Sequence, residues 1–348
     1  MVLYLLSPNL LSGIGQVMVK YNELLGGTLV DIHDQSIDFT GADVFAFALP
    51  ISIWFEKLEN IKRVAKNVIC MTVCETETVH PDYGKLFKMF NTVLVPSEFC
   101  KNIFSRQFHD TKFKVVRHWE PLPEPSPDRT NSKKYVFYHI GNILDHRKQI
   151  NHIIRAFQEL NLPDAQLVLK ATCKQPVQIK LPNVLVINGL LPKEQLDSIH
   201  NACDCYVSFS NSEGVGMGAV EAALRDKPVI LSSYGGAVEY INTDYVINCK
   251  MKTVGVDDFL YSAYMFWGDP DYETLKKHMK HVYDNKIRHV NHEYTRILLE
   301  RKTIRTQLFE SLSIPTDPQQ ELLVPGHSAG HEEELSYHQP DQSQWVVL

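Results

Sequence analysis

Short apolar runs alternate with longer amphipathic segments along the first third of the chain. The apolar runs have the length and composition of buried strands, and the amphipathic segments repeat their apolar positions with helical spacing. The predicted strands cover residues 2–6, 28–33, 43–49, 68–73, 92–96 and 114–118, and the clearest predicted helices cover 15–25 and 98–108. Strands that alternate with helices in this way are typical of a parallel sheet covered by helices.

A proline-rich segment interrupts the alternation, which then starts again. Residues 120–134, EPLPEPSPDRTNSKK, contain four prolines, which are unsuited to the interior of a helix or a sheet. After this segment, strands are predicted at 135–141, 165–171, 183–188, 204–210, 228–233 and 244–249, and helices at 149–160, 193–202, 216–225, 273–285 and 292–312. This pattern predicts two doubly wound α/β domains that face each other across a cleft.

The same pattern sets the expected domain bounds. The first domain covers residues 1–122, a linker covers 123–134 and the second domain covers 135–290. A C-terminal helical segment, 291–313, could pack back on the first domain, and the polar residues 314–348 are expected to form a mobile tail. A length of 348 residues agrees with two domains, because single hydrophobic cores stop growing near about 250–300 residues.

Composition and charge narrow the function classes. The chain is 44% hydrophobic and 22% charged, and its net charge of −6 provides no overall basic field for nucleic acid. No stretch approaches the roughly 20 apolar residues of a membrane span. The apolar start, MVLYLLSPNLLSG, lacks the basic region and cleavage site of a signal peptide. The seven cysteines form no CxxC pair, so we expect buried free thiols and a cytoplasmic protein.

The richest candidate site lies in residues 210–241. Glu213 stands in a glycine-containing loop, and Glu221 follows about one turn into the next helix. Free backbone amides at the start of that helix are expected to bind an anion, and they belong to Gly216, Met217 and Gly218. We expect Glu221 to accept hydrogen bonds from ribose hydroxyls and Glu213 from sugar hydroxyls. Two glutamates at this spacing also occur by chance, so the spacing supports a binding site only together with the surrounding sequence.

A second candidate site precedes the helix predicted at 149–160. Gly141 ends the preceding strand, and Arg147 and Lys148 stand just before the helix. Two cations at a helix N-terminus oppose its macrodipole at a cost of roughly 0.3–1 kcal/mol each. An anion between them would reverse that effect. A solvated Arg-Lys pair is the common alternative, but the placement favours a diphosphate.

Together these segments resemble the C-terminal domain of retaining GT-B glycosyltransferases of family 4. That family carries an E-x7-E element, which corresponds here to Glu213 and Glu221, and a glycine followed six residues later by Arg-Lys, which corresponds to Gly141 and the pair at 147–148. The family's GG-x-x-E after PVI matches residues 235–239. The resemblance is strong over roughly 135–245 and implies the GT-B fold, in which two Rossmann-like domains face each other across a cleft.

The resemblance also implies roles for individual residues. Arg147 and Lys148 would hold the donor diphosphate, Glu221 would bind the ribose, and Glu213 would position the transferred sugar as a catalytic residue.

Two positions depart from the family pattern. Asn142, which we count with Gly141 among the donor-binding candidates, stands where the family is often basic, so one phosphate contact is expected to be missing. Asp226 replaces a frequent glycine, with little expected effect because it lies beyond the ligand end of the helix.

The first domain resembles the family less closely. Residues 5–25 look like the family's first strand, glycine loop and helix, so the loop is expected to approach the donor phosphates or the acceptor through Ser12, Gly13, Ile14 and Gly15. Residues 72–108 resemble members with a WETD-like segment and a VPSEF strand-to-helix junction, although Cys74 stands where tryptophan is frequent. The residues expected to face the cleft are the catalytic candidate Glu75, Thr76 and His80. A simple tight turn and ordinary capping residues are the alternatives.

Three other signals are not assigned a function. Residues 269–271 match a metal-binding DxD pattern but lie in a loop far from the donor motifs, where a helix-initiating turn is the better interpretation. The fifteen histidines show no clear metal-ligand spacing, so no metal and no other cofactor are expected. Residues 55–67 could form a basic amphipathic helix that touches a membrane, but a solvated helix face is commoner.

The functional prediction is a retaining, metal-independent glycosyltransferase. It would move a sugar from a UDP- or GDP-linked donor to a hydroxyl of a glycan, a lipid or a small molecule. In the family's usual account, the departing phosphate helps to deprotonate the acceptor, so no strong protein base is needed. Contacts to the nucleobase are expected from loops 170–174 and 188–191. A nucleotide-sugar epimerase and a catalytically inactive nucleotide-binding scaffold are the alternatives.

Overall fold

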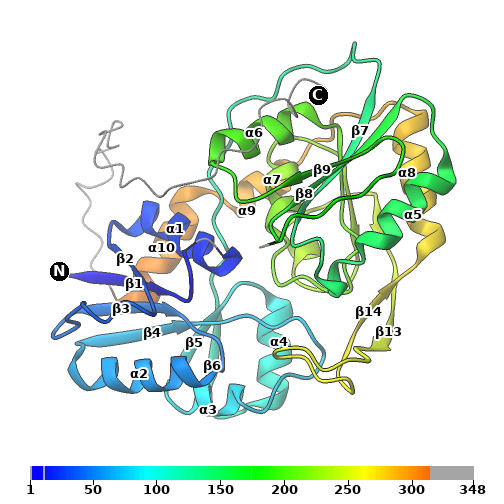
Figure 1. Cartoon of the computed structure of the whole chain (residues 1–348). Coiled ribbons are helices and arrows are strands. Elements are labelled where there is room, and N and C mark those ends of the chain that lie inside the picture. The colour runs from blue at the N-terminus through cyan, green and yellow to red at the C-terminus, as the bar shows by residue number, and fades with distance from the viewer. Residues whose placement is uncertain (1, 11, 174, 314–348) are drawn as a thin grey trace.

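The computed structural model describes residues 2–10, 12–173 and 175–313, which form two α/β domains (Figure 1). Residues 314–348, where we expect a tail, lie outside the described residues. The strands of the first domain are β1 (Leu3–Ser7), β2 (Thr28–Asp31), β3 (Asp43–Phe47), β4 (Asn67–Met71), β5 (Thr92–Val95) and β6 (Lys112–Val115). They pair in parallel in the order β2-β1-β3-β4-β5-β6. The helices of this domain are α1 (Gly13–Leu25), α2 (Ser52–Val64), α3 (Tyr83–Phe87) and α4 (Glu98–Gln107).

The second domain repeats this architecture. Its sheet contains β7 (Tyr135–Gly141), β8 (Ala165–Ala171), β9 (Val184–Asn188), β10 (Cys205–Val207), β11 (Val229–Ser232) and β12 (Val246–Ile247). These strands are parallel in the order β12-β11-β10-β7-β8-β9. The main helices are α5 (Ile150–Leu160), α6 (Lys193–Ala202), α7 (Met217–Ala223) and α8 (Tyr272–Asp284). The predicted fold class, two doubly wound parallel sheets, is therefore confirmed.

Successive side chains of the central strands explain why helices cover both faces of each sheet. In β7, Tyr135 and Phe137 join the core cluster that includes α5 and α8. Their neighbours Val136 and Tyr138 join the cluster that includes α6 and α7. Because side chains alternate across a strand, a strand that is apolar at every position must be buried on both faces.

The predicted strand at 244–249 is wrong in its extent. Only Val246–Ile247 joins the sheet, and the chain then forms an antiparallel hairpin from β13 (Cys249–Thr253) and β14 (Phe266–Pro270). The turn between the two sheets is held by the backbone amide of Cys249, which donates to the Ser233 hydroxyl at 3.0 Å. The apolar residues continue through this turn. The sequence pattern therefore does not show that the two parts of this segment pair in different sheets.

The single helix predicted at 292–312 is also wrong, because it consists of α9 (Glu293–Leu298) and α10 (Arg301–Leu312). The hydroxyl of Thr295 in α9 donates to the Tyr240 carbonyl of the second domain at 2.8 Å. In α10, Ile304 and Leu308 pack with Trp119 in one of the two core clusters of the first domain. The break allows the chain to cross from one domain to the other (Figure 1).

The basic amphipathic segment predicted at 55–67 lies mostly in α2. Trp54, Leu58 and Ile61 are buried in the core cluster of the first domain, so the apolar side of this helix faces the protein. Among the described residues, no helix is long and apolar enough to cross a membrane.

Docking of α10 onto the first domain is expected to contribute to stability. Leu308 is fully buried, so Leu308→Ala should lower the free energy of unfolding by about 2–5 kcal/mol through lost burial and a cavity. Thr306→Ala, at an exposed position of the same helix, is the matched control. Chemical denaturation measures both variants, and equal midpoints for Leu308→Ala and wild type would contradict the docking.

Candidate active site

The loops that follow β7 and β10 bring the two donor motifs of the second domain into one cluster. Lys148 Nζ forms an ion pair with Glu213 Oε1, which also accepts a hydrogen bond from the Ser210 hydroxyl at 2.8 Å. Arg147 NH1 lies 3.3 Å from Glu213 Oε2. These side chains are largely withdrawn from solvent. Lys148 and Glu213, which are 65 positions apart in the sequence, are thus in direct contact.

The first domain contributes Glu75 to the same cluster. Its Oε1 lies 3.1 Å from Arg147 NH1 and accepts a hydrogen bond from the Gly214 amide at 3.2 Å. Its other oxygen accepts a hydrogen bond from the Tyr261 hydroxyl, which comes from the loop of the β13–β14 hairpin. Glu75 therefore lies at the boundary between the two domains, where it contacts the second domain. Tyr261 was missed, because nothing in the local sequence marks a tyrosine in a hairpin loop.

A short turn fixes the direction of the two cations. His146–Lys148 form a single turn of 3₁₀ helix, and the Asp145 carboxylate accepts from the Arg147 amide at 2.9 Å. Gln149 adopts the left-handed conformation (φ 52°), and α5 begins at the next residue. Arg147 also donates to the Ser212 carbonyl and lies 3.1 Å from Asp145 Oδ2. Arg147 is consequently held by several internal acceptors, whereas Glu213 is the only ion-pair partner recorded for Lys148 among the described residues.

The charges of this cluster control one another. Burial alone would raise the pKa of Glu213, but Lys148 and Arg147 outweigh burial and lower that pKa to about 2. Burial would lower the pKa of Arg147, but Glu75 and Glu213 raise it above its usual value. Glu213 therefore stays ionised at neutral pH, and it accepts hydrogen bonds but does not donate them.

Glu221 belongs to a different cluster from Glu213. It projects from α7 and forms an ion pair with Lys20 of α1 at 3.1 Å, and its other oxygen lies 3.2 Å from His200 Nε2. Lys20 also pairs with the buried Glu120, in the segment that leaves the first domain. Burial would raise the pKa of Glu221 and lower that of Lys20, but their attraction reverses both shifts.

Sequence reasoning missed Lys20 and Glu120. Lys20 lies in the amphipathic segment 15–25 and Glu120 is the first residue of the proline-rich segment, and neither belongs to a recognisable motif. Their pairing is set by contacts between segments 100 residues apart. No signal available from one sequence would have found it.

The predicted glycine loops lie where the domains approach each other. Gly13, at the start of α1, would place a Cβ 3.4 Å from the methyl carbon of Met217, at the start of α7. Gly216 caps α7 in the left-handed conformation (φ 73°), which glycine adopts without strain. Gly218 leaves room for the Tyr206 hydroxyl, which a Cβ would approach to 2.5 Å. Gly15 allows the tight start of α1, where Ser12 accepts a hydrogen bond from the Gly15 amide at 3.0 Å.

Other predicted residues have local partners. Asn142 accepts from the Leu144 amide at 3.2 Å, which shapes the loop after β7. His80 accepts from the Asp82 amide at 3.2 Å, which agrees with the capping alternative. Thr76 is buried and donates to Met265 Sδ in the hairpin. Asp271 accepts from the Thr274 amide at 2.7 Å and caps α8, which confirms the helix-initiating turn.

The two loops expected to contact a nucleobase lie together. Lys170 Nζ donates to the Gly189 carbonyl at 2.6 Å, and Asn188 accepts from the Val177 amide at 2.7 Å. Burial lowers the pKa of Lys170 to about 8. Residue 174 lies outside the described residues.

All seven cysteines are free, and most are buried, as expected. Among the described residues, no group of three or more His, Cys, Asp or Glu side chains could hold a metal ion.

His139 is a further buried group beside the donor cluster that sequence reasoning did not select. Its Nδ1 lies 2.8 Å from the Val207 carbonyl oxygen, so Nδ1 carries the proton. Its Nε2 has no hydrogen-bond partner among the described residues and would lie 3.2 Å from a Cβ at Gly141. Burial and the charge of Lys148 lower the pKa of His139 to about 4. The imidazole is therefore neutral at physiological pH.

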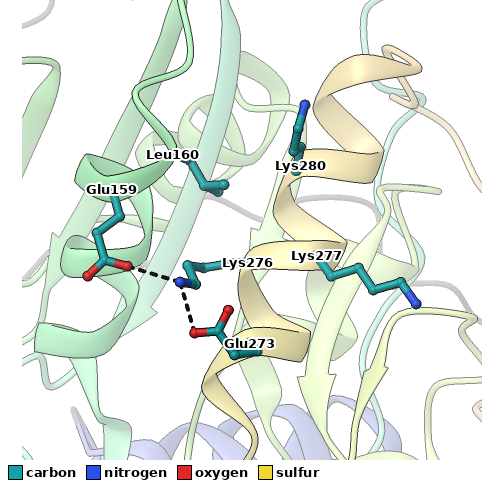
Figure 2. A pocket seen from close by; sticks show the side chains of 6 residues that line it. All are labelled: Glu159, Leu160, Glu273, Lys276, Lys277 and Lys280. Atoms are coloured by element: carbon teal, nitrogen blue, oxygen red, sulfur yellow. Dashed lines mark hydrogen bonds and ion pairs between the residues drawn. The ribbon is translucent and has the colours of Figure 1, made fainter.

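Two hollows lie outside these clusters. Figure 2 shows one on the outer face of the second domain, between α5 and α8, where Lys276 pairs with Glu159 at 3.1 Å and Glu273 at 2.9 Å. A larger groove of about 880 Å³ lies between α4 of the first domain and residues 233–239 of the second. Glu239 lines this groove and accepts from the amides of Glu98 and Phe99 at 2.8 and 2.5 Å, so it caps α4 across the domain boundary.

Protonation of His139 is expected to make stability depend on pH. The unfolded chain binds a proton near its usual pKa of 6.5, but the folded state resists protonation until about pH 4. The contribution of His139 to stability is thus complete above about pH 6.5 and falls by up to about 1.4 kcal/mol per pH unit as the pH drops toward 4.

His139→Asn, which keeps a donor for the Val207 carbonyl, should remove this dependence, as measured by urea unfolding between pH 7 and 4.5. The exposed His109→Asn should retain the wild-type profile. A constant difference in unfolding free energy between His139→Asn and wild type at every pH would contradict the assignment.

The comparisons with known proteins agree with this architecture. Residues 124–250 match the family model of glycosyl transferases group 1. A trehalose-phosphate synthase (UDP-forming) from Burkholderia xenovorans, solved with glucose-6-phosphate, is 10% identical, with a TM-score of 0.56 over 79% of this chain and 74% of that chain. The sucrose-phosphate synthase of Thermosynechococcus elongatus is 13% identical, with a TM-score of 0.57 over 90% and 96%. No curated protein matches the chain.

A third solved structure is the pneumococcal O-GlcNAc transferase GtfA in complex with UDP and GlcNAc. It is 14% identical, with a TM-score of 0.55 over 79% of this chain and 57% of that chain. At these identities, the structural likeness establishes the fold alone. The chain therefore has the GT-B fold of two Rossmann-like domains, and the family match over 124–250 supports a glycosyltransferase.

Proposed function

We propose that the chain is a retaining, metal-independent glycosyltransferase that uses a nucleotide-diphosphate sugar. The observation that carries the proposal is the meeting of Lys148, Arg147 and Glu213 beside the start of α7, within the segment that matches glycosyl transferases group 1. This arrangement supplies cations for a diphosphate and an ionised carboxylate for sugar hydroxyls in one place.

Donor binding on this proposal is an exchange of partners. Lys148 is paired with Glu213 in the structure, and Glu221 is paired with Lys20. The donor diphosphate would replace Glu213 on Lys148, and the freed carboxylate would accept hydrogen bonds from the sugar. Ribose hydroxyls would compete with Lys20 for Glu221. Each exchange replaces one charge-assisted contact by another, so the desolvated charges are never left unpaired.

The reaction breaks the bond between the anomeric carbon and the diphosphate oxygen. Negative charge grows on the leaving diphosphate, and Lys148 stabilises it together with Arg147 and the amides at 216–218. The acceptor hydroxyl attacks from the same face and passes its proton to the departing phosphate oxygen. Glu213 is assigned as a hydrogen-bond acceptor for the sugar, because Lys148 and Arg147 lower its pKa to about 2 and keep it ionised before the donor binds.

The catalytically inactive scaffold is the second candidate, and one observation favours it. Arg147 contacts Glu75, Asp145 and the Ser212 carbonyl. These internal contacts would explain the presence of Arg147 even if it bound no ligand. A scaffold would bind nucleotide without releasing sugar. Lys148 is therefore the better residue for testing donor binding, and turnover distinguishes the two functions.

Replacement of Lys148 is expected to weaken donor binding. Lys148→Met removes a charge-assisted contact worth about 1.5–3 kcal/mol, which corresponds to roughly 10–150-fold in the Kd of a nucleoside diphosphate. Calorimetric titration with UDP, GDP and ADP measures this change and identifies the preferred base. Lys133→Met, at an exposed lysine beside the second domain, is the matched control.

Sugar release from the matching nucleotide sugar then tests catalysis. Glu213→Gln should keep nucleotide affinity within a few-fold and lose most of the release. If Lys148→Met binds nucleotide as tightly as wild type, the donor site is wrong. If wild type binds nucleotide and turns over no sugar on any donor, the scaffold is correct.

A further inference from the structure

The β13–β14 hairpin, residues 249–270, leaves the second domain and contacts the first. Leu260 at its tip is buried in the core cluster of the first domain that also contains Trp54 of α2. The Glu77 amide donates to the Phe266 carbonyl at 2.8 Å. Tyr261 donates to Glu75, as described above. The tip, residues 254–265, is therefore fixed beside the donor cluster.

Exposed aromatic side chains are concentrated on this hairpin. Among the described residues, four aromatic side chains are strongly exposed, and three of them lie on this hairpin. They are Phe259 at 65%, Tyr264 at 65% and Phe266 at 43% exposure, and the fourth, Tyr294 at 48%, lies on α9. Apolar surface that gathers in one place usually marks a binding site, whereas scattered exposed side chains need no explanation.

The backbone at the tip holds one ring outward at an energetic cost. Phe259 adopts the left-handed conformation (φ 50°), which is unusual for a bulky residue. Two hydrogen bonds close the turn, from the Asp258 amide to the Tyr261 carbonyl at 2.9 Å and from the Tyr261 amide to the Asp258 carbonyl at 2.8 Å. This turn buries Leu260 and leaves the adjacent Phe259 in solvent. A strained, exposed ring next to a tightly anchored residue indicates a role in binding.

The charges at the tip point to a neutral, hydroxyl-rich ligand. Residues 254–265 include Asp257 and Asp258 and contain no Lys, Arg or His. Asp257 uses one oxygen to accept from the Ala263 amide at 2.8 Å, and Asp258 lies 3.6 Å from His146 Nδ1. Carboxylates accept hydrogen bonds from hydroxyls, and aromatic faces pack against the C–H faces of sugar rings. Anionic membranes and phosphorylated ligands would instead meet repulsion from these carboxylates.

We propose that the hairpin tip is the acceptor subsite and that it binds a neutral carbohydrate. The sugar packs on Phe259 and Tyr264, and Asp257 accepts hydrogen bonds from its hydroxyls. His146 and Tyr261 connect this subsite to the donor cluster, because His146 precedes Arg147 and Tyr261 contacts Glu75. This inference rests on the proposed glycosyltransferase function and specifies its acceptor.

The experiment uses the full chain and the variant Phe259→Gly/Tyr264→Ala. Glycine accepts the left-handed backbone without strain, so the fold is expected to be retained. Tyr294→Ala removes an exposed ring elsewhere and is the control. Ligand-observed NMR titrations use maltose, cellobiose, lactose and sucrose as neutral probes, glucose-6-phosphate as an anionic probe, and phosphatidylcholine vesicles with and without phosphatidylserine.

At least one neutral disaccharide should bind wild type and the control, and bind the double variant at least about tenfold more weakly, or 1.4 kcal/mol. Nucleoside diphosphate affinity should be equal in all three proteins. The inference is overturned if no neutral disaccharide binds wild type, if the double variant binds as well as wild type, or if only vesicles or glucose-6-phosphate respond to loss of the rings. If wild type does not bind nucleoside diphosphates, the donor site is refuted. The sugar titration would still test the acceptor subsite independently.

Discussion

Buried charges shared between the two domains are the constraint on which the rest of the structure depends. Lys20 of the first domain pairs with Glu221 of the second, and Glu75 of the first pairs with Arg147 of the second. Separating such a pair inside the protein would leave an uncompensated buried charge, at a cost of about 3–5 kcal/mol. The domains can part only if water or a ligand reaches these charges as they separate. The relative position of the domains and the state of the candidate site are therefore coupled.

This coupling follows from the position of the loops that carry the charged residues. These loops follow the carboxyl ends of the parallel strands, and the corresponding edges of the two sheets face each other. Gly214 and Gly236 then allow the backbones to approach, because a Cβ at Gly236 would lie 2.9 Å from the Ser97 hydroxyl and a Cβ at Gly214 would collide with Val73. Glu239 adds a direct link by capping α4, where it also pairs with Arg117 at 2.5 Å. These contacts favour a closed arrangement of the two domains.

The fold could be predicted because it depends on local patterns that one sequence contains. The alternation of apolar runs and amphipathic segments predicted both sheets, and the strand predicted at 135–141 coincides with β7. The meeting of Lys148 with Glu213 could be predicted from the motif resemblance and the rule that loops gather at one sheet edge. The contacts of Lys20, Glu120 and Tyr261 could not be predicted, because their partners are distant in sequence and no local motif marks these residues. The break between α9 and α10 was hidden for the same reason, since it depends on two separate docking surfaces.

Asp226 illustrates how a residue other than glycine can be accommodated at a left-handed backbone position. Asp226 has a left-handed backbone (φ 55°), a conformation that glycine adopts without strain. Its carboxylate accepts from the His292 amide at 3.2 Å and pairs with Arg296 at 2.5 Å, so it anchors α9 to the second domain. The strain of an aspartate at this position is offset by contacts that glycine could not make. Because α9 leads into α10, this anchor also helps to hold the chain where it returns to the first domain, so a residue remote from the donor cluster supports the same closed arrangement.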